Sequence, residues 1–461
     1  MVNVVNLLGS VVKAPTGLWE TILNWIESSV LNYGWVIILF TLLVKVCLSP
    51  LDLLMKFSSK KSTLVQQKCA PQIARINKKY ANDRNAAQLQ TQQVYKKEGY
   101  NMYTSCIVMI LNLAITLTVF LTLFNSLREM SAYKAILQYD ALQTSYVQTY
   151  EGKLDEVYTN FEQEMNKYTT IIYTDGETQT EEALDYQALK ANFELVASET
   201  NPETETETGI FHKFFGINVS DKLVLSEQSL RIQNASVKDA EQNTVTIISL
   251  LTNSGKIAAN AASDSATETW AKVKEKWLWI DNIWVAETYK SPLPTYDDLA
   301  SMAKSSKNAE YQKYINNTDK TLYNVITNSV DEQSGRWNGY FIIAILAGVT
   351  SFLSQWISEK MSKPKNKQVS QYVDQANPQA NGTMKFMKIL LPAMMVIFVL
   401  TSSAAFGLYI VASSIISIGI SALTTVIVDA CYKKKQAEVD EFLYKQVEKS
   451  VRKSKRGLKE N

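Results

Sequence analysis

The sequence predicts an all-α polytopic membrane protein: a five-transmembrane-helix bundle with a cytosolic helical hairpin and a large inserted extracytoplasmic domain that is mostly helical. Three observations lead to this fold class. Apolar stretches of about twenty residues recur, and each is long enough to cross a hydrocarbon core about 30 Å thick. Basic segments separate or follow these stretches, and one long acidic segment interrupts their succession. The predicted spans are residues 32–54, 104–125, 338–358, 385–402 and 406–430.

Charge is distributed unevenly along the 461 residues, although the net charge is only +2. Residues 55–103 hold ten Lys/Arg and two Asp/Glu, and residues 431–461 hold ten and five. Residues 126–337 hold nineteen Lys/Arg and thirty-two Asp/Glu. Because cytoplasmic segments carry the excess of Lys and Arg, the pattern predicts an external N-terminus, an external acidic domain and a cytoplasmic C-terminus.

Composition argues against catalysis and against bound metals. The chain has a single histidine, His212, and its four cysteines have no metal-site spacing. None of the cysteines lies in the acidic segment, so that segment has no disulfide framework. The sequence also lacks a phosphate-binding P-loop. We therefore expect no cofactor, no metal, no nucleotide and no enzymatic activity.

Residues 1–31 are predicted to be an N-terminal segment that ends in an amphipathic helix after Pro15-Thr16-Gly17. This helix is too polar to span a bilayer, and it fits one that lies in the outer interface. An ordinary packed helix fits the same pattern. Its apolar face consists of Leu18, Trp19, Ile22, Leu23, Trp25, Ile26 and Val30.

The first span contains a lysine. Lys45 follows Tyr33 by twelve residues, about 18 Å of helix, and so lies well inside the hydrocarbon core. A charge there costs at least about 2.5–3.5 kcal/mol, and such residues usually face a bundle interior or an aqueous cavity. The alternative is that Lys45 extends to the inner headgroups, but Asp52 and Lys56 already mark that interface. Pro50 is expected to bend the last turns of the span.

Residues 55–103 are predicted to form a basic hairpin of two antiparallel helices. Pro71 interrupts the first helix, and Ala81-Asn82-Asp83 forms the turn before the second. Because the hairpin adjoins two spans, its charge favours contacts with lipid headgroups, ribosomes or clients over contacts with DNA. The basic side chains of interest are Lys56, Lys60, Lys61, Arg75, Lys78, Lys79, Lys96 and Lys97.

The second span places Asn112 at mid-membrane, where it can hydrogen-bond to another helix or line a polar cavity. In the external region, residues 127–167 and 296–325 have helical patterns, and Val245 to Leu251 could be a strand. Trp277, Trp279 and Trp284 fit either a rim at the outer headgroups or packing within the domain.

The remaining segments complete the predicted topology. A polar cytosolic loop covers residues 359–384, and the last two spans are joined by a tight turn at Ser402-Ser403-Ala404-Ala405. A basic cytosolic tail follows from residue 431. Its cations fit contacts with ribosomal RNA or with lipid equally well. They are Lys433, Lys434, Lys435, Arg452, Lys453, Lys455 and Arg456.

Five motifs, taken in chain order, are similar to those of a known family. They are Leu48-Ser49-Pro50-Leu51 after the buried cation, Tyr95 to Asn101 at the hairpin exit, Cys106 to Asn112, Ile345 to Phe352 with Gln355, and Pro392 with Gly407-Leu408-Tyr409. Trp279-Ile280-Asp281-Asn282-Ile283 adds a sixth likeness. The order of these motifs resembles the YidC/Oxa1/Alb3 membrane protein insertases over residues 16–125 and 335–432. The chain departs from the family pattern at Lys45, where the family has arginine, and at Asn112, where it has glutamine.

The resemblance implies a membrane insertase or chaperone of the bacterial plasma membrane. Such a protein passes hydrophilic segments of nascent membrane proteins through a positively charged groove that is open to the cytosol, and releases their spans into lipid. Its partners would be nascent clients and the bilayer, with the ribosome or a Sec-type translocon as further candidates. The groove cation would be Lys45, the polar lining Asn112, Gln355, Ser414 and Thr41, and the hairpin would capture clients.

Two other functions remain open from the residues alone. A small-solute or ion transporter could use Lys45 as its site, although it predicts an inverted internal repeat that the sequence does not show. An adhesion or receptor protein could act through residues 126–337, but that function leaves the polar residues at mid-membrane without a purpose.

Overall fold

The computed structural model describes residues 12–30, 32–99, 102–190, 231–232, 234–287, 291–334, 338–339, 341–362 and 378–457. The chain divides into two compact units. The membrane unit consists of residues Thr16–Ser131, Glu275–Thr288 and Asn338–Asn461, and the inserted unit of Met1–Pro15, Ala132–Lys274 and Tyr289–Trp337.

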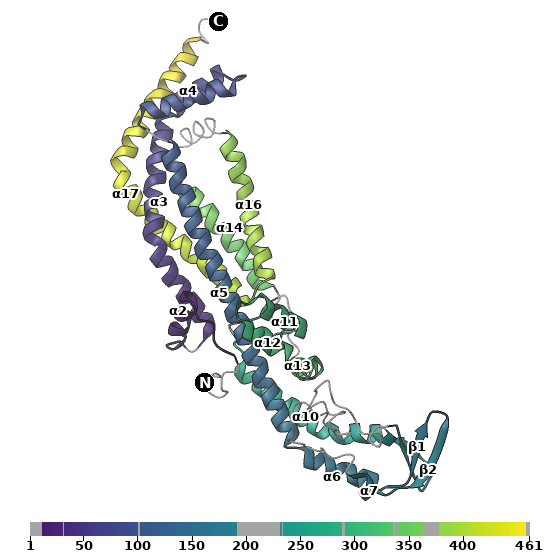
Figure 1. Cartoon of the computed structure of the whole chain (residues 1–461). Coiled ribbons are helices and arrows are strands. Elements are labelled where there is room, and N and C mark those ends of the chain that lie inside the picture. The colour runs from purple at the N-terminus through teal and green to yellow at the C-terminus, as the bar shows by residue number, and fades with distance from the viewer. Residues whose placement is uncertain are drawn as a thin grey trace. The chain divides into compact units, whose positions relative to one another are not determined.

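The membrane unit is built from long helices (Figure 1). Among the described residues, α3, α5, α14 and α17 are long and apolar enough to span a membrane. The predicted fourth span falls in α16, whose described apolar part, Ile389–Leu400, is shorter. The helices are α2 (Leu18–Glu27), α3 (Tyr33–Lys79), α4 (Arg84–Lys97), α5 (Met102–Glu151, to Ser131 in this unit), α14 (Ile342–Ser362), α16 (Pro378–Leu400) and α17 (Ala404–Gly457).

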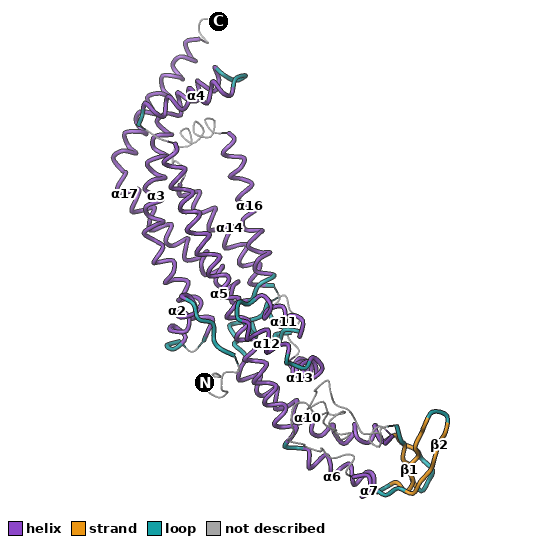
Figure 2. The backbone as a smooth tube through the Cα atoms, in the orientation of Figure 1, coloured by secondary structure: helices purple, strands orange, loops and turns teal. Residues whose placement is uncertain are grey.

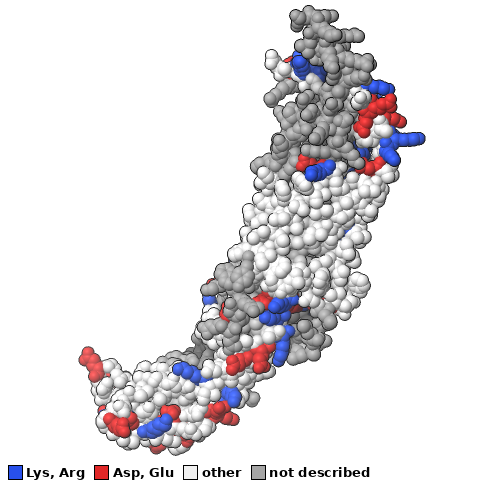
Figure 3. Space-filling view, turned by 180° about the vertical axis from the view of Figure 1, so that it is seen from behind, with Lys and Arg blue, Asp and Glu red and all other residues white. Residues whose placement is uncertain are grey.

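The surface of these helices matches a lipid environment. Figure 3 shows a broad band over the membrane unit that is nearly free of Lys, Arg, Asp and Glu. Large apolar side chains such as Leu113, Ile345 and Val426 are more than 60% exposed there. Exposed apolar surface of this extent is typical of helices that face acyl chains, so the chain is a multi-pass helical membrane protein.

Helix α3 continues through both of its prolines, where the sequence predicted a bend and an interruption. Pro50 has no N–H to donate to the carbonyl of Val46, one turn earlier. The Ser49 hydroxyl donates to that carbonyl instead, at 2.8 Å. Helix α3 thus joins the predicted first span and the first hairpin helix in a single element.

The hairpin is formed by the end of α3 and by α4. The Asp83 side chain caps α4 by accepting the Ala86 N–H at 3.0 Å. Tyr95 of α4 packs against Cys69, Ala70 and Ile73 of α3 in a small apolar core. These contacts hold the two hairpin helices together beyond the membrane span.

Helix α2 packs against other helices on one face and leaves apolar side chains exposed on another. Leu23 and Ile26 are buried, and the Trp19 indole packs edge-on to Phe40 and donates to the Thr122 hydroxyl at 3.1 Å. Leu18 and Trp25, by contrast, are 70% and 67% exposed. One face therefore packs on α3 and α5, and apolar side chains remain available to lipid.

In its described residues, the inserted unit is mostly helical and contains a small antiparallel sheet in the strand order β2-β1-β3-β4 (Figure 2). The strands are β1 (Tyr168–Asp175), β2 (Thr178–Ala183), β3 (Ser236–Asp239) and β4 (Thr244–Thr246). Besides the end of α5, the helices are α6 (Leu154–Met165), α7 (Tyr186–Lys190), α10 (Ile247–Val273), α11 (Tyr296–Ser305), α12 (Ala309–Asn316) and α13 (Lys320–Ser334).

The strand expected from Val245 to Leu251 was largely a wrong prediction. Only Val245 and Thr246 pair with β3, and Thr246 then serves as the N-cap of α10. Ile247, Leu250 and Leu251 are buried at helical spacing. A short apolar run does not by itself distinguish strand from helix, and here the helical spacing decides which residues reach the core.

Candidate functional site: a polar seam between the membrane helices

Residues 275–287, which we call the connecting segment, contact the first turns of three membrane helices. At α3, the Asn32 amide donates to the Lys276 carbonyl at 2.9 Å, and the Tyr33 ring lies 4.5 Å from that of Trp284. At α17, the N–H groups of Ala404 and Ala405 donate to carbonyls of the connecting segment at 2.9 and 2.7 Å. These bonds pair backbone groups that a helix start leaves unsatisfied.

At α14 the connecting segment supplies a buried carboxylate. Glu287 accepts the N–H groups of Ile343 and Ala344, each at 2.9 Å, at the positive end of the helix. Burial raises the pKa of Glu287, and the two backbone hydrogen bonds partly oppose that effect. Nearby, the Asn338 side chain accepts the Asn282 N–H at 2.8 Å and donates to the Asn282 carbonyl at 2.7 Å.

The tryptophans of the connecting segment differ in burial. Trp284 is fully buried, whereas Trp279 is 38% exposed. Between Trp277 and Ile280 the chain makes a tight turn, in which Leu278 is 59% exposed and has a φ of 50°. The segment thus contacts the starts of α3, α14 and α17 and keeps apolar side chains exposed beside them.

Lys45 lies on a polar stripe of α3. Its side chain is half-buried, and within the described residues its ammonium has no hydrogen bond or ion pair. Asp52 and Lys56 follow at seven and eleven residues, so each lies within about 20° of Lys45 around the helix axis, on opposite sides of it. Thr41, one turn before Lys45, is buried, and its hydroxyl donates to the Ile37 carbonyl at 2.6 Å.

Two hydroxyl pairs connect α14 to α17. Ser351 and Ser414 lie 3.2 Å apart, and Ser358 and Ser421 lie 3.3 Å apart, seven residues further along both helices. Gln355, which the sequence proposed as lining, is half-buried on α14 between the two pairs. Small hydroxyl residues at such spacing let helices approach closely and hydrogen-bond across the interface.

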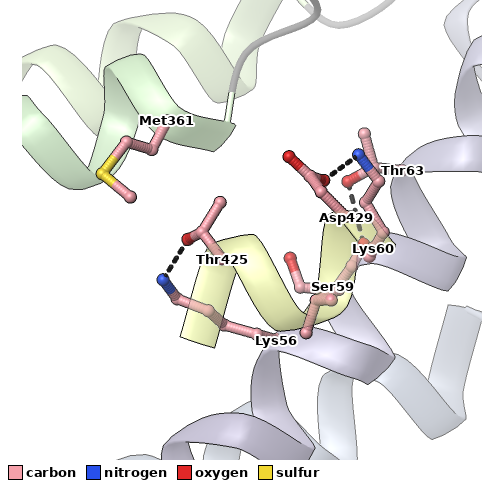
Figure 4. A pocket seen from close by; sticks show the side chains of 8 residues that line it. Lys56, Ser59, Lys60, Thr63, Met361, Thr425 and Asp429 are labelled. Atoms are coloured by element: carbon pink, nitrogen blue, oxygen red, sulfur yellow. Dashed lines mark hydrogen bonds and ion pairs between the residues drawn. The ribbon is translucent and has the colours of Figure 1, made fainter. Parts of the chain in front are cut away.

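Lys56 of α3 forms hydrogen bonds with Ser421 of the second pair. Its ammonium donates to the Ser421 carbonyl at 2.6 Å, the Ser421 hydroxyl at 2.7 Å and the Thr425 hydroxyl at 2.6 Å. One turn on, Lys60 forms an ion pair with Asp429 at 2.8 Å. Figure 4 shows Lys56, Lys60, Thr425 and Asp429 at a small pocket that is lined by residues of α3, α14 and α17.

Helices α3 and α17 run parallel in a constant register. Lys56 bonds to Thr425, Lys60 to Asp429 and Gln67 to Gln436, and each pair is separated by 369 residues in sequence. If this offset continued three turns toward the start of α3, Lys45 would be level with Ser414. We refer to the stripe of α3 and the hydroxyl pairs of α14 and α17 together as the polar seam.

Asn112 is the polar residue predicted for the second span. Its side-chain oxygen is buried and lacks a hydrogen-bond partner among the described residues. Its neighbours Leu111 and Leu113 on α5 are 58% and 64% exposed. A buried amide oxygen without a partner costs about 1–3 kcal/mol, which is consistent with a site that receives a further polar group.

Some of the predicted hairpin cations contact α17, and the others are exposed. Lys56 and Lys60, predicted to belong to the client-capturing hairpin, instead contact α17. Six hairpin cations are exposed: Lys61, Arg75, Lys78, Lys79, Lys96 and Lys97. In the tail, Lys433, Lys434 and Lys435 are exposed on α17, and the side chains of Arg452, Lys453, Lys455 and Arg456 lie outside the described part of the chain.

The fold and the seam define a class: multi-pass helical membrane proteins with a cation and hydroxyl groups inside the bundle. The model of one family, described as 60Kd inner membrane protein, matches residues 25–175 and 267–430. The chain therefore belongs to this family, the YidC/Oxa1/Alb3 family, as its motifs suggested. Its multi-pass helices and this membership make it a protein of the bacterial plasma membrane.

Curated relatives match shorter segments. A membrane protein insertase YidC from Anaeromyxobacter sp. is 35% identical over 105 residues, 23% of this chain and 18% of the relative. The protein of that name from Leptospira interrogans is 36% identical over 89 residues, 19% and 14% of the two chains. That from Aromatoleum aromaticum is 28% identical over 123 residues, 27% and 21%. The matched part thus covers about a fifth or less of each relative. No solved structure matches the chain.

Proposed function

We propose that this protein is a membrane protein insertase that moves hydrophilic segments of nascent membrane proteins along the polar seam and releases their apolar spans into lipid. The observation that carries the proposal is Lys45: a half-buried lysine without a hydrogen-bond or ion-pair partner among the described residues, in a helix long and apolar enough to span a membrane. The names of the relatives support the same activity.

The physical reason is the cost of polar groups in hydrocarbon. Each unsatisfied backbone group costs several kcal/mol in the bilayer core. A seam of hydroxyl groups offers temporary hydrogen bonds, and Lys45 attracts acidic side chains of the client. The connecting segment bonds α3, α14 and α17 together at one end. In this proposal, the polar path therefore opens from the opposite end and leads only part of the way across.

In this proposal, the exposed cations of the hairpin and tail bind the client before insertion. Their charge suits nascent chains, anionic headgroups and, for the tail, ribosomal RNA. A Sec-type translocon is a further candidate partner. In this proposal the inserted unit and the N-terminus are external, the hairpin and C-terminus are cytoplasmic, and α16 supplies the fifth span. Insertion is driven by burial of the client's apolar span and needs no nucleotide or cofactor.

The test is insertion of two matched single-span clients into liposomes that contain only this protein, scored by protease protection. One client carries an acidic translocated tail, and the other carries the same tail with its acids changed to amides. We expect Lys45→Gln to lower insertion of the acidic client about fivefold, the value of roughly 1 kcal/mol of lost attraction. The amide client should change little, and Lys45→Arg should retain insertion of both.

The outcomes separate the two parts of the proposal. If Lys45→Gln lowers insertion of both clients equally, the charge mechanism is wrong and the insertase activity stands. If folded wild-type protein protects neither client, autonomous insertion is wrong.

A further inference from the structure

A second charged site lies at the end of the seam that is opposite the connecting segment, three helical turns beyond Lys45. It is the pocket lined by Lys56, Lys60, Thr425 and Asp429, with Met361 and Val428 as apolar neighbours (Figure 4). The Lys60 and Asp429 side chains are 24% and 43% exposed, so a ligand can reach the ion pair. The question is which ligand the position and the charge favour.

The position matches a layer of lipid headgroups. Lys56 follows Tyr33 by twenty-three residues, about 35 Å of helix rise. Trp35 and Trp277, which pack together at the start of α3, mark the opposite interface. The hydrocarbon core is about 30 Å thick, and a typical tilt of about 20° shortens the axial distance by only a few ångström. The Lys56 ammonium therefore lies at the depth of phosphate groups.

The surface around the pocket faces lipid. On α17, Val426 is 68% exposed and Ile427 is 40% exposed, immediately between the lining residues Thr425 and Val428. Leu423, on the preceding turn, is 63% exposed. The polar pocket is thus continuous with an apolar surface, as a molecule with a charged head and acyl chains requires.

The charge of the lining is incompletely balanced. The three N–H groups of Lys56 donate to uncharged oxygens of Ser421 and Thr425. Lys60 shares the single lining carboxylate, Asp429. Asp52, one turn before Lys56, is exposed and attracts the Lys56 ammonium, but it does not line the pocket. A phosphate oxygen would bond more strongly to an ammonium than a neutral hydroxyl does, because hydrogen bonds between charged groups are roughly twice as strong.

We propose that this pocket binds the phosphate of an anionic phospholipid headgroup, such as phosphatidylglycerol, from the leaflet at this end of the span. The phosphate would contact Lys56 and Lys60, and the glycerol and acyl chains would follow Met361, Val428 and the exposed apolar face of α17. The proposal does not depend on the insertase activity, because it concerns only the binding of lipid.

The test compares two substitutions that break the same ion pair and leave opposite charges. Lys60→Gln removes a cation, and Asp429→Asn removes the competing carboxylate; neither touches the three bonds of Lys56. Binding of phosphatidylglycerol to the purified full-length protein in a zwitterionic detergent is measured by native mass spectrometry. Because a cation near anionic lipid changes binding about fivefold, we expect Lys60→Gln to weaken binding about fivefold and Asp429→Asn to strengthen it about fivefold.

Control substitutions distinguish binding at this pocket from diffuse attraction of the lipid to surface cations. Lys61→Gln removes the same charge from the adjacent, exposed position and should change binding less than twofold. Equal losses in the Lys60 and Lys61 variants would mean diffuse attraction and would overturn the site. Weakening by both Lys60→Gln and Asp429→Asn would show that the ion pair is structural only.

Competitors identify the ligand. Phosphatidylcholine, which carries phosphate without net charge, should bind at least fivefold more weakly than phosphatidylglycerol. Equal binding of the two lipids would overturn recognition by charge. Displacement of phosphatidylglycerol by inorganic phosphate at matched concentration would assign the pocket to a soluble anion. Displacement by an acidic peptide would assign it to a client carboxylate. Either result would refute the lipid proposal.

Discussion

The buried Glu287 carboxylate allows a sharp test of how the connecting segment stabilises α14. Glu287 accepts two backbone N–H groups at 2.9 Å. A hydrogen bond to a charged group contributes about 1.5–3 kcal/mol, so the pair contributes about 3–6 kcal/mol before the cost of burying the charge. Glu287→Ala removes both acceptors, and Ile343 and Ala344 are buried. The substitution also removes the cost of burying the Glu287 charge, so we expect Glu287→Ala to lower the free energy of unfolding by about 2–4 kcal/mol.

The pH dependence of stability provides the finer measurement. The pKa of Glu287 is raised from its ordinary value of 4.5, chiefly by burial. Between that value and the raised pKa, the folded state holds a proton that the unfolded state has released. The stabilising contribution is therefore complete below pH 4.5 and is lost as the pH rises through the folded pKa, at up to about 1.4 kcal/mol per pH unit.

The assay is equilibrium unfolding in mixed micelles, followed by tryptophan fluorescence from pH 4 upward. Glu287→Gln does not titrate, so the free energy of unfolding of the wild type relative to this variant should decline as the pH rises. Glu177, exposed in the turn between β1 and β2, is the control, and Glu177→Gln should not alter the profile. A difference that is constant, or that grows with pH, would refute the conclusion that burial outweighs the two hydrogen bonds.

Three further outcomes follow from the same contacts, each measured by unfolding in micelles. Asn338→Ala should cost about 2–4 kcal/mol, because the buried N–H and C=O of Asn282 both lose their partner; a cost below 1 kcal/mol would contradict this. Leu278→Gly should gain about 0.5–1 kcal/mol by relieving the left-handed backbone of an exposed residue, and destabilisation would contradict it. A double-mutant cycle of Ser351→Ala and Ser414→Ala should give a coupling near 0.6 kcal/mol, whereas zero coupling would exclude the hydrogen bond.

Much of the fold was predictable from local signals. The apolar stretches, their aromatic borders and the segregation of charge are properties of contiguous residues, so they predicted the spans within α3, α5, α14 and α17. Helical spacing likewise predicted the inserted unit's helices within residues 127–167 and 296–325, but it did not predict α10. The failures were also local: the apolar run at Val245 fitted two structures, and Pro71 suggested an interruption that the surrounding helix tolerates.

The candidate site was only partly predictable. Lys45 was recognisable because a charged side chain within an apolar span is energetically costly and usually faces a bundle interior or an aqueous cavity. Ser414 was chosen as lining, but its partner Ser351 was not identified. Lys56 and Lys60 were assigned to the hairpin by their place in the sequence, whereas their contacts lie on α17. No pattern in the neighbourhood of a lysine shows which distant helix its ammonium will reach.

The sequence by itself determined the membrane class, the positions of the long helices and the presence of a cation within the first span. These depend on composition and periodicity over twenty residues or so. Only the tertiary structure decided that contacting residues of α3 and α17 are 369 positions apart in sequence. It also decided that the connecting segment contacts the starts of α3, α14 and α17. The reason is physical: such contacts join residues far apart in the chain, and their geometry is set by which side chains and backbone groups satisfy one another once the helices have packed.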